Sequence, residues 1–107
     1  MRRYEVRVDA IVEADLEQMR HYLTSVQGAA FARRFTGQAI AQIRKLRIVP
    51  YRGTSLDDVR PGVRSITWKR SVIIVFRVVD DEHRVDVVGI FYRGRDVRTA
   101  LSERLKD

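Results

Sequence analysis

The sequence predicts an α+β domain in which two helices pack against a small antiparallel β-sheet. Three observations lead to this prediction. A strand-like alternation opens the chain, two helical periodicities follow before Pro50, and three strand-like runs with short connections fill residues 63–92. Short connections join neighbouring strands in opposite directions, so these runs should form an antiparallel meander. With 107 residues, of which 45% are hydrophobic, the chain is expected to be a single domain over residues 1–107.

The N-terminal half is predicted to be a strand followed by an antiparallel helix hairpin. Residues 3–9 alternate between apolar and charged side chains, which is typical of a half-buried strand. Two apolar stripes at helical spacing come next: Val12, Leu16, Met19 and Leu23, then Ala32, Phe35, Ala39, Ile43 and Leu46. Residues 26–28 interrupt the pattern, and so short a break favours antiparallel helices. The second helix must end before Pro50, because proline disfavours helix at the preceding residue.

Gly37 lies inside the second predicted helix, where glycine costs roughly 1 kcal/mol relative to alanine. A close crossing of the two helices would explain its presence, because glycine has no side chain to hold them apart. We therefore expect the helices to approach each other at this residue.

The C-terminal half is predicted to hold three strands and a short helix. Residues 50–62 form a loop marked by proline, glycine and aspartate, and strands follow at 63–69, 71–80 and 84–92. The middle run is apolar on both faces, so it should be a central strand that the helix hairpin covers on one side. The last helix would place Val97, Leu101 and Leu105 on one face, with Asp96 as its N-cap.

The charge of the chain limits the kinds of partner it can have. A formal net charge of +7 and a pI of about 10.5 attract nucleic acid, a ribosome, an acidic protein or an anionic membrane. The alternative is a basic surface that is simply solvated. The lack of cysteine excludes disulfides and thiolate metal sites and suits a reducing cytoplasm. Neither a signal peptide nor the roughly 20 apolar residues of a spanning helix are recognisable.

Short motifs along nearly the whole chain indicate a family. They are Ala14-Asp15-Leu16, Ala32-x-x-Phe35, Ile43-x-x-Leu46-x-x-x-Pro50-x-x-Gly53, Pro61-Gly62-Val63-Arg64, Phe76-Arg77-Val78-Val79-Asp80-Asp81 and Gly89-Ile90-Phe91-Tyr92-Arg93-Gly94-Arg95-Asp96. In this order and spacing, the chain resembles the RelE/ParE superfamily of toxins from bacterial type II toxin–antitoxin modules. The last block is most similar to the ParE branch, although Tyr92 stands where that branch usually has a histidine.

The resemblance implies a cytoplasmic toxin that a cognate antitoxin neutralises. In such systems an often acidic, amphipathic C-terminal segment of the antitoxin wraps the toxin, and its N-terminal part is usually a DNA-binding dimerisation domain. The positive charge of this chain independently suits an acidic partner, because opposite charges speed association. ParE-like members poison DNA gyrase by protein–protein contact, whereas RelE-like members cleave mRNA on the ribosome. No cofactor is expected for either activity.

The nuclease alternative would use Arg64, Tyr92 and Arg95 as its catalytic residues. Cleavage needs a base for the 2′-hydroxyl, an acid for the leaving group and cations for the phosphate. Ile66 and Ile73 stand where further catalytic cations are often found in that branch, and aliphatic side chains cannot stabilise phosphate charge. A neutral phenol is also a weak base, unless neighbouring arginines help it to ionise.

The gyrase-inhibitor interpretation is therefore favoured, and it requires no catalytic residues. Arg64, Arg93 and Arg95 are then candidates for binding an anion or a partner. Each has a structural alternative: Arg64 could form a surface salt bridge with Asp57 or Asp58, and Arg95 could pair with a neighbouring carboxylate or carbonyl.

The remaining candidates favour structural roles. Trp68 and Tyr92 could stack bases, but packing at the sheet is the preferred interpretation. Arg77, inside an apolar strand, is expected either to point outward or to form a buried ion pair. His21 and His83 are far apart, and no acidic cluster has ligand spacing near them, so no metal site is expected.

Overall fold

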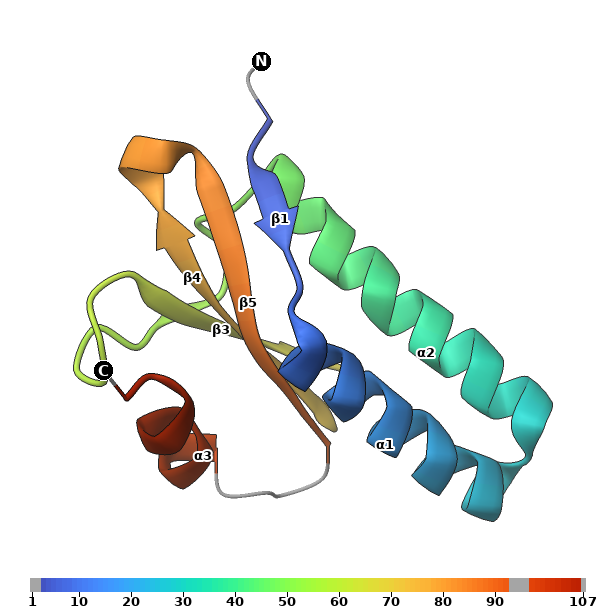
Figure 1. The fold of residues 1–107 in the computed structure, drawn as a ribbon. Coiled ribbons are helices and arrows are strands. Elements are labelled where there is room, and N and C mark those ends of the chain that lie inside the picture. Colours follow the sequence, from blue (N-terminus) through green and yellow to red (C-terminus); the bar gives the residue numbers. More distant parts are fainter. Residues whose placement is uncertain (1–2, 93–96, 107) are drawn as a thin grey trace.

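The computed structural model describes residues 3–92 and 97–106. Its sheet has two long helices on one side and a short C-terminal helix on the other (Figure 1). The elements in chain order are β1 (Glu5–Arg7), α1 (Ala10–Gln27), α2 (Ala29–Arg44), the 3₁₀ turn η1 (Lys45–Arg47), β2 (Thr54–Ser55), β3 (Val63–Trp68), β4 (Val72–Val79), the 3₁₀ turn η2 (Asp80–Glu82), β5 (Arg84–Tyr92) and α3 (Val97–Arg104). The predicted α+β class is confirmed.

The sheet has five strands in the order β1-β5-β4-β3-β2. Strands β3, β4 and β5 form the predicted antiparallel meander, with β4 between the other two. In contrast, β1 pairs parallel with β5, so the sheet is mixed rather than wholly antiparallel. A short connection fixes the relative direction of consecutive strands, but β1 and β5 are far apart in the chain and have no such constraint. The two-residue β2 pairs with β3, and it lies inside the segment 50–62 that was predicted to be a loop.

A single residue, Gly28, joins α1 to α2. Its φ of 91° lies in the left-handed region that favours glycine, and its backbone N–H donates to the carbonyl of Thr24 at 3.0 Å. At the other end of α1, the Asp9 carboxylate accepts a hydrogen bond from the Val12 amide at 3.2 Å and caps the helix. The predicted antiparallel hairpin is confirmed (Figure 1).

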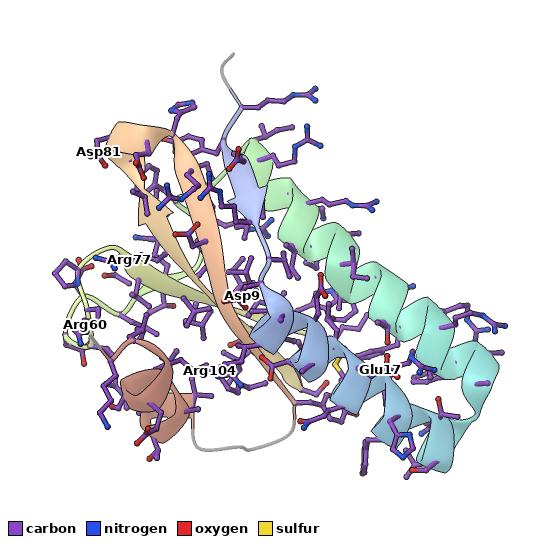
Figure 2. The ribbon with its side chains drawn as sticks, viewed as in Figure 1. Asp9, Glu17, Arg60, Arg77, Asp81 and Arg104 are labelled. Carbon is purple, nitrogen blue, oxygen red and sulfur yellow. The ribbon has the colours of Figure 1, made fainter. Side chains whose placement is uncertain are left out.

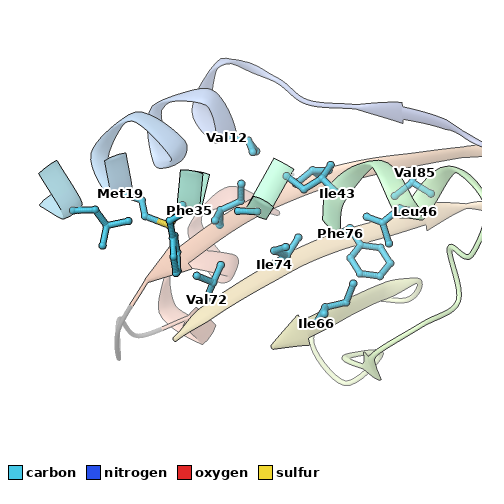
Figure 3. Packing of buried hydrophobic residues seen from close by; sticks show 14 of the residues in the cluster. Val12, Met19, Phe35, Ile43, Leu46, Ile66, Val72, Ile74, Phe76 and Val85 are labelled. Atoms are coloured by element: carbon cyan, nitrogen blue, oxygen red, sulfur yellow. The ribbon is translucent and has the colours of Figure 1, made fainter. Parts of the chain in front are cut away.

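The predicted apolar stripes of the two helices pack on one face of the sheet (Figure 3). We call this cluster the hairpin core. Its buried members are Val12, Met19, Leu23, Ala32, Phe35, Ala39, Ile43, Leu46, Ile66, Val72, Ile74, Phe76, Val78, Val85, Val87 and Ile90. On the opposite face, α3 covers a smaller cluster, the α3 core, built on Val63, Val75, Phe91 and Leu101. Because β4 contributes to both clusters, its apolar character on both faces is explained.

Two details of the predicted helices are checked by the structure: the surroundings of Gly37 and the apolar face of the C-terminal helix. An added Cβ at Gly37 would meet nothing within 4 Å, so the predicted close crossing there is wrong and the glycine lies on an open surface of α2. In the C-terminal helix, Leu101 is buried as predicted, and Leu105 packs beside it just after the helix ends. The predicted N-cap, Asp96, lies outside the described residues.

A buried ion pair that no sequence pattern indicated joins α3 to α1. Arg104 donates to both carboxylate oxygens of Asp15, at 2.6 and 2.8 Å, and reaches toward α1 in Figure 2. Asp15 also accepts a hydrogen bond from the Ile90 amide on β5 at 3.0 Å. Arg104 donates to the Val88 carbonyl at 3.2 Å and lies over the Phe91 ring. One pair of side chains therefore connects two helices and the edge of β5.

Candidate partner-binding surfaces

A groove of about 780 Å³ runs between β1 and the helix hairpin. We call it the hairpin groove. Its apolar lining consists of Tyr4, Val6, Val8, Leu16, Ile40 and Ile43, and its charged lining consists of Arg3, Glu5, Glu13, Arg44 and Arg47. The groove therefore combines an apolar interior with a majority of cations among its charged residues.

One wall of the hairpin groove is the outer edge of the sheet. The Glu5 amide donates to the His83 carbonyl at 3.0 Å, on the β5 side of β1. The Tyr4 amide points the other way and donates to the Arg47 carbonyl at 2.8 Å. Backbone groups alternate in direction along a strand, so those of Val6 share the Tyr4 side and face away from β5. An edge of this kind can pair with an added strand.

The charges of the hairpin groove favour an acidic occupant. Arg44 and Arg47 have no carboxylate partner among the residues that the structure describes. Glu5, by contrast, is already paired with Arg7 at 2.5 Å. An apolar groove with unpaired arginines suits an amphipathic peptide that carries acidic side chains.

A cluster of polar side chains surrounds Tyr4, one of the residues that line the hairpin groove. The Tyr4 hydroxyl donates to Asp80 at 2.5 Å, and Tyr51 also hydrogen-bonds to Asp80. The hydrogen bond to Asp80 is the main cause that raises the pKa of Tyr4 to about 12. The hydrogen bonds from Tyr4 and Tyr51 lower the pKa of Asp80. The His83 ring stacks on Tyr4 with 3.9 Å between ring centroids, so β1, the loop before β2 and the β4–β5 turn are joined.

Arg64, a predicted anion-binding residue, is engaged within the fold. Its guanidinium donates to the backbone carbonyls of Arg52 at 3.0 Å and Gly53 at 3.3 Å. These bonds hold the loop before β2 against β3. The loop lies so close that a Cβ on Gly53 would approach the Ser65 carbonyl oxygen to 2.1 Å.

The predicted salt bridge between Arg64 and Asp57 or Asp58 is wrong. Asp57 accepts from the Gly62 amide at 2.9 Å and stabilises the turn before β3. Asp58 pairs with Arg98 of α3 at 2.9 Å, an ion pair that lowers the pKa of Asp58. Both carboxylates therefore have partners other than Arg64.

Tyr92 and Trp68 pack at the opposite end of the sheet, as predicted. Tyr92 is half-buried, and its ring lies 5.7 Å from that of Tyr22 and 6.1 Å from that of Phe35. Trp68 lies 5.0 Å from Phe35. Arg77 is exposed, which confirms the outward orientation among the two expected for it (Figure 2).

The structure does not bring Arg64 and Tyr92 together. Arg64 pairs with Phe76 across the β3–β4 ladder, whereas Tyr92 pairs with Val72 across the β4–β5 ladder. Phe76 and Val72 are four residues apart on β4, which corresponds to roughly 13 Å along the strand. Arg93 and Arg95 lie outside the described residues, so their positions stay a prediction.

Ile66 and Ile73, which the family resemblance aligns with positions that are often cationic in the nuclease branch, both pack in apolar clusters. Ile66 is buried in the hairpin core, and Ile73 packs against the α3 core. Among residues 3–92 and 97–106, no three histidine, aspartate or glutamate side chains gather as metal ligands. Within the same ranges, no helix is both long and apolar enough to cross a membrane.

Solved structures of bacterial toxins share this fold. A chain of the chromosomal ParDE toxin–antitoxin system from P. aeruginosa matches with a TM-score of 0.72 and 21% identity, over 85% of this chain and 97% of that chain. The RelBE2 toxin–antitoxin complex of Mycobacterium tuberculosis matches with a TM-score of 0.61 and 15% identity, over 85% of this chain and 99% of that chain. The isolated E. coli RelE toxin matches with a TM-score of 0.51 and 15% identity, over 95% of this chain and 98% of that chain. At these identities the likeness shows a RelE/ParE toxin fold and no more.

The family of the protein is identified by comparing its amino-acid sequence with models of known families. No curated protein sequence matches the chain significantly. The sequence model of a family described as the ParE toxin of the type II toxin–antitoxin system parDE matches residues 6–97. Because this match covers most of the chain, the protein belongs to the ParE toxin family, which confirms the superfamily resemblance noted from its motifs.

Proposed function

We propose that this ParE-family toxin inhibits DNA gyrase by protein–protein contact. The observation that supports the proposal most directly is the aliphatic character of Ile66 and Ile73. Both side chains pack into apolar clusters at the positions where the nuclease branch often has cations. A toxin that acts by contact has no phosphate to stabilise and needs no cations there.

The second candidate is a ribosome-dependent endoribonuclease. The fold likeness to a RelBE2 complex and to an isolated RelE toxin is the observation that favours it. This candidate would use Arg64, Tyr92 and Arg95, although Arg64 is engaged with backbone carbonyls.

Two assays on the purified toxin separate these candidates: plasmid supercoiling by DNA gyrase, and mRNA integrity on translating ribosomes. We expect supercoiling to be inhibited, with cleaved plasmid trapped, and mRNA to stay intact. The Tyr92→Phe variant should inhibit gyrase as well as the wild type does, because no phenol takes part in contact inhibition. If the wild type cleaves mRNA and leaves supercoiling normal, and the Tyr92→Phe variant no longer cleaves mRNA, the protein is a nuclease instead.

The hairpin groove is the proposed site for the cognate antitoxin. Its open strand edge, apolar lining and unpaired arginines suit an acidic, amphipathic segment. Two of the similar structures are of a toxin–antitoxin system and a toxin–antitoxin complex. Arg64, Arg93 and Arg95 remain proposed contacts to an anion or partner. A gyrase or ribosome target would also place the toxin in the cytoplasm.

A further inference from the structure

The connection between β3 and β4 has an unusual backbone for its residues. The two central residues of this turn, Lys69 and Arg70, have φ values of 51° and 61°. The Ser71 amide donates to the Trp68 carbonyl at 3.3 Å and closes the turn. Positive φ at both central positions defines a type I′ turn, which strongly prefers Asn-Gly or another glycine-containing pair. Two long cationic side chains therefore occupy strained positions that would suit other residues better.

A hollow of about 400 Å³ lies beside this turn, at its junction with α2. Phe31, Phe35 and Gln38 line it, together with the turn residues Lys69 and Ser71 and with Arg34 of α2. The Lys69 ammonium donates to the Gln38 side-chain oxygen at 3.1 Å and lies over the rings of Trp68, at 5.2 Å, and Phe35, at 5.9 Å. The hollow therefore has aromatic walls and a cation at its mouth.

The cations around the hollow lack acidic partners. None of Arg34, Lys69 and Arg70 forms an ion pair with a carboxylate of the described residues. Elsewhere on the surface, arginines such as Arg20, Arg84 and Arg98 do pair with carboxylates. Two unpaired cations that line the hollow, Arg34 and Lys69, and the next residue of the turn, Arg70, can receive an anionic group whose apolar part contacts the two phenylalanine rings.

We propose that this surface, the turn surface of Lys69, Arg70 and Arg34 around the hollow, contacts the target protein. It would bind a segment of that protein with an acidic side chain beside an apolar one. The carboxylate would pair with the cations, and the apolar side chain would enter the hollow beside the stacked rings of Phe31 and Phe35. Backbone strain that is retained at such a surface is typical of binding sites. The inference rests on the proposed function, because it assumes a toxin that acts by protein contact.

An acidic protein segment suits this surface better than a nucleic acid strand does. Single-stranded nucleic acids are bound by stacking bases on free aromatic faces. Here the Lys69 ammonium already lies over Trp68 and Phe35, and Phe31 stacks on Phe35 with 5.7 Å between centroids. A base would have to displace these groups, whereas a carboxylate need only reach the ammonium.

The test is a turn variant, Lys69→Asn with Arg70→Gly, which installs the pair that the turn prefers. Relief of strain should raise the melting temperature by at least about 4 °C. Loss of two cations should raise the concentration for half-inhibition of gyrase supercoiling by about tenfold or more. Arg34→Gln, which leaves the turn unchanged, should weaken inhibition in the same direction.

The matched control, Arg33→Gln with Lys106→Gln, removes the same net charge from exposed positions outside the turn surface. It should inhibit gyrase within about twofold of the wild type. A turn variant that is more stable and inhibits equally well would overturn the inference and leave the proposed function intact. A lower melting temperature in the turn variant would overturn the argument from backbone strain.

Two further outcomes identify other errors. If the wild-type toxin does not inhibit gyrase, the proposed function falls and this inference falls with it. If the wild type binds single-stranded oligothymidine or oligouridine, and the turn variant loses that binding while it still inhibits gyrase, the surface is a nucleic-acid site and the inference is wrong.

Discussion

Tyr4 joins segments that lie far apart in the sequence. Its hydroxyl bonds to Asp80, 76 residues away, its amide bonds to the Arg47 carbonyl, and its ring stacks on His83. The sequence showed Tyr4 only as one apolar position in an alternating strand. Alternation predicts which face a side chain occupies but not which polar group will lie opposite it. The partner became visible only when the β4–β5 turn was placed beside β1.

Tyr4→Phe should change how stability depends on pH. The folded-state pKa of Tyr4, about 12, is above its ordinary value of 10.0. The hydrogen bond to Asp80 therefore contributes its full stability below pH of about 10, and this contribution declines as pH rises toward about 12. Urea unfolding across this range should show a steeper decline for the wild type than for Tyr4→Phe. Equal slopes for the two proteins would contradict this role.

For Asp80, the other member of the Tyr4–Asp80 hydrogen bond, the pKa shift has the opposite sign. Hydrogen bonds from Tyr4 and Tyr51 lower the pKa of Asp80, so its contribution is present at neutral pH and is lost as pH falls through the folded-state pKa. Tyr4→Phe should therefore be less stable than the wild type at neutral pH. The difference should shrink in acid, where Asp80 is protonated.

At the scale of elements, α3 depends on side chains rather than on its own helical tendency. It spans only eight residues, Val97–Arg104, and helices this short are marginal alone. Leu101 inserts into the α3 core, and Arg104 reaches Asp15 on α1. Gly89 leaves room for this contact, because a Cβ there would approach Arg104 Nη1 to 2.6 Å.

Asp15→Ala should destabilise the protein strongly. The side chains of Asp15 and Arg104 are 4% and 16% exposed, so the substitution leaves a mostly buried guanidinium without its carboxylate. Loss of one partner of a buried pair costs about 3–5 kcal/mol in unfolding free energy. Urea unfolding at neutral pH measures this. The control is Glu17→Ala, which breaks an exposed pair on the same helix (Figure 2) and should cost under about 1 kcal/mol. Similar losses in the two variants would contradict a structural role for the buried pair.

At the scale of the whole molecule, a net charge of +7 should speed association with an acidic partner. The structure concentrates part of this charge at the hairpin groove, through arginines of α2 and η1. Other cations surround the hollow at the opposite end of α2, beside the β3–β4 turn. The proposed contacts with the antitoxin and with the target therefore lie on two separate cationic surfaces.

Arg44→Glu with Arg47→Glu should weaken binding of the proposed cognate antitoxin. Charge reversal at the hairpin groove should reduce the association rate by about tenfold or more at low ionic strength. Added salt should reduce the difference between the association rates of the wild type and of the variant. Surface plasmon resonance at several salt concentrations measures this. The control, Arg33→Glu, reverses one exposed charge of α2 that does not line the groove, and it should slow association by less than half as much on a logarithmic scale. If Arg33→Glu slows association as much as the groove variant does, the binding site lies elsewhere.

Much of the fold could be predicted because its patterns are local. Helical periodicity located α1 and α2, and the apolar runs located β3, β4 and β5, since burial on one or both faces leaves a repeat within a few residues. The close crossing at Gly37 failed as an expectation, because a glycine in sequence does not reveal what faces it. The alternative of an Arg64 salt bridge failed for the same reason: nearby aspartates were visible in the sequence, but the backbone carbonyls that Arg64 contacts in the folded loop were not.

The amino-acid sequence was enough to predict the order of the helices and of every strand except β2, the central position of β4, the strong positive charge and the toxin family. These properties depend on short-range periodicity, on composition or on motifs read along the chain. The folded structure was needed to establish the parallel pairing of β1 with β5, the hairpin groove, the turn surface and the ion pair between residues 89 positions apart. Each of these requires distant segments to meet, and the geometry of that meeting follows from packing of the whole core rather than from any one segment.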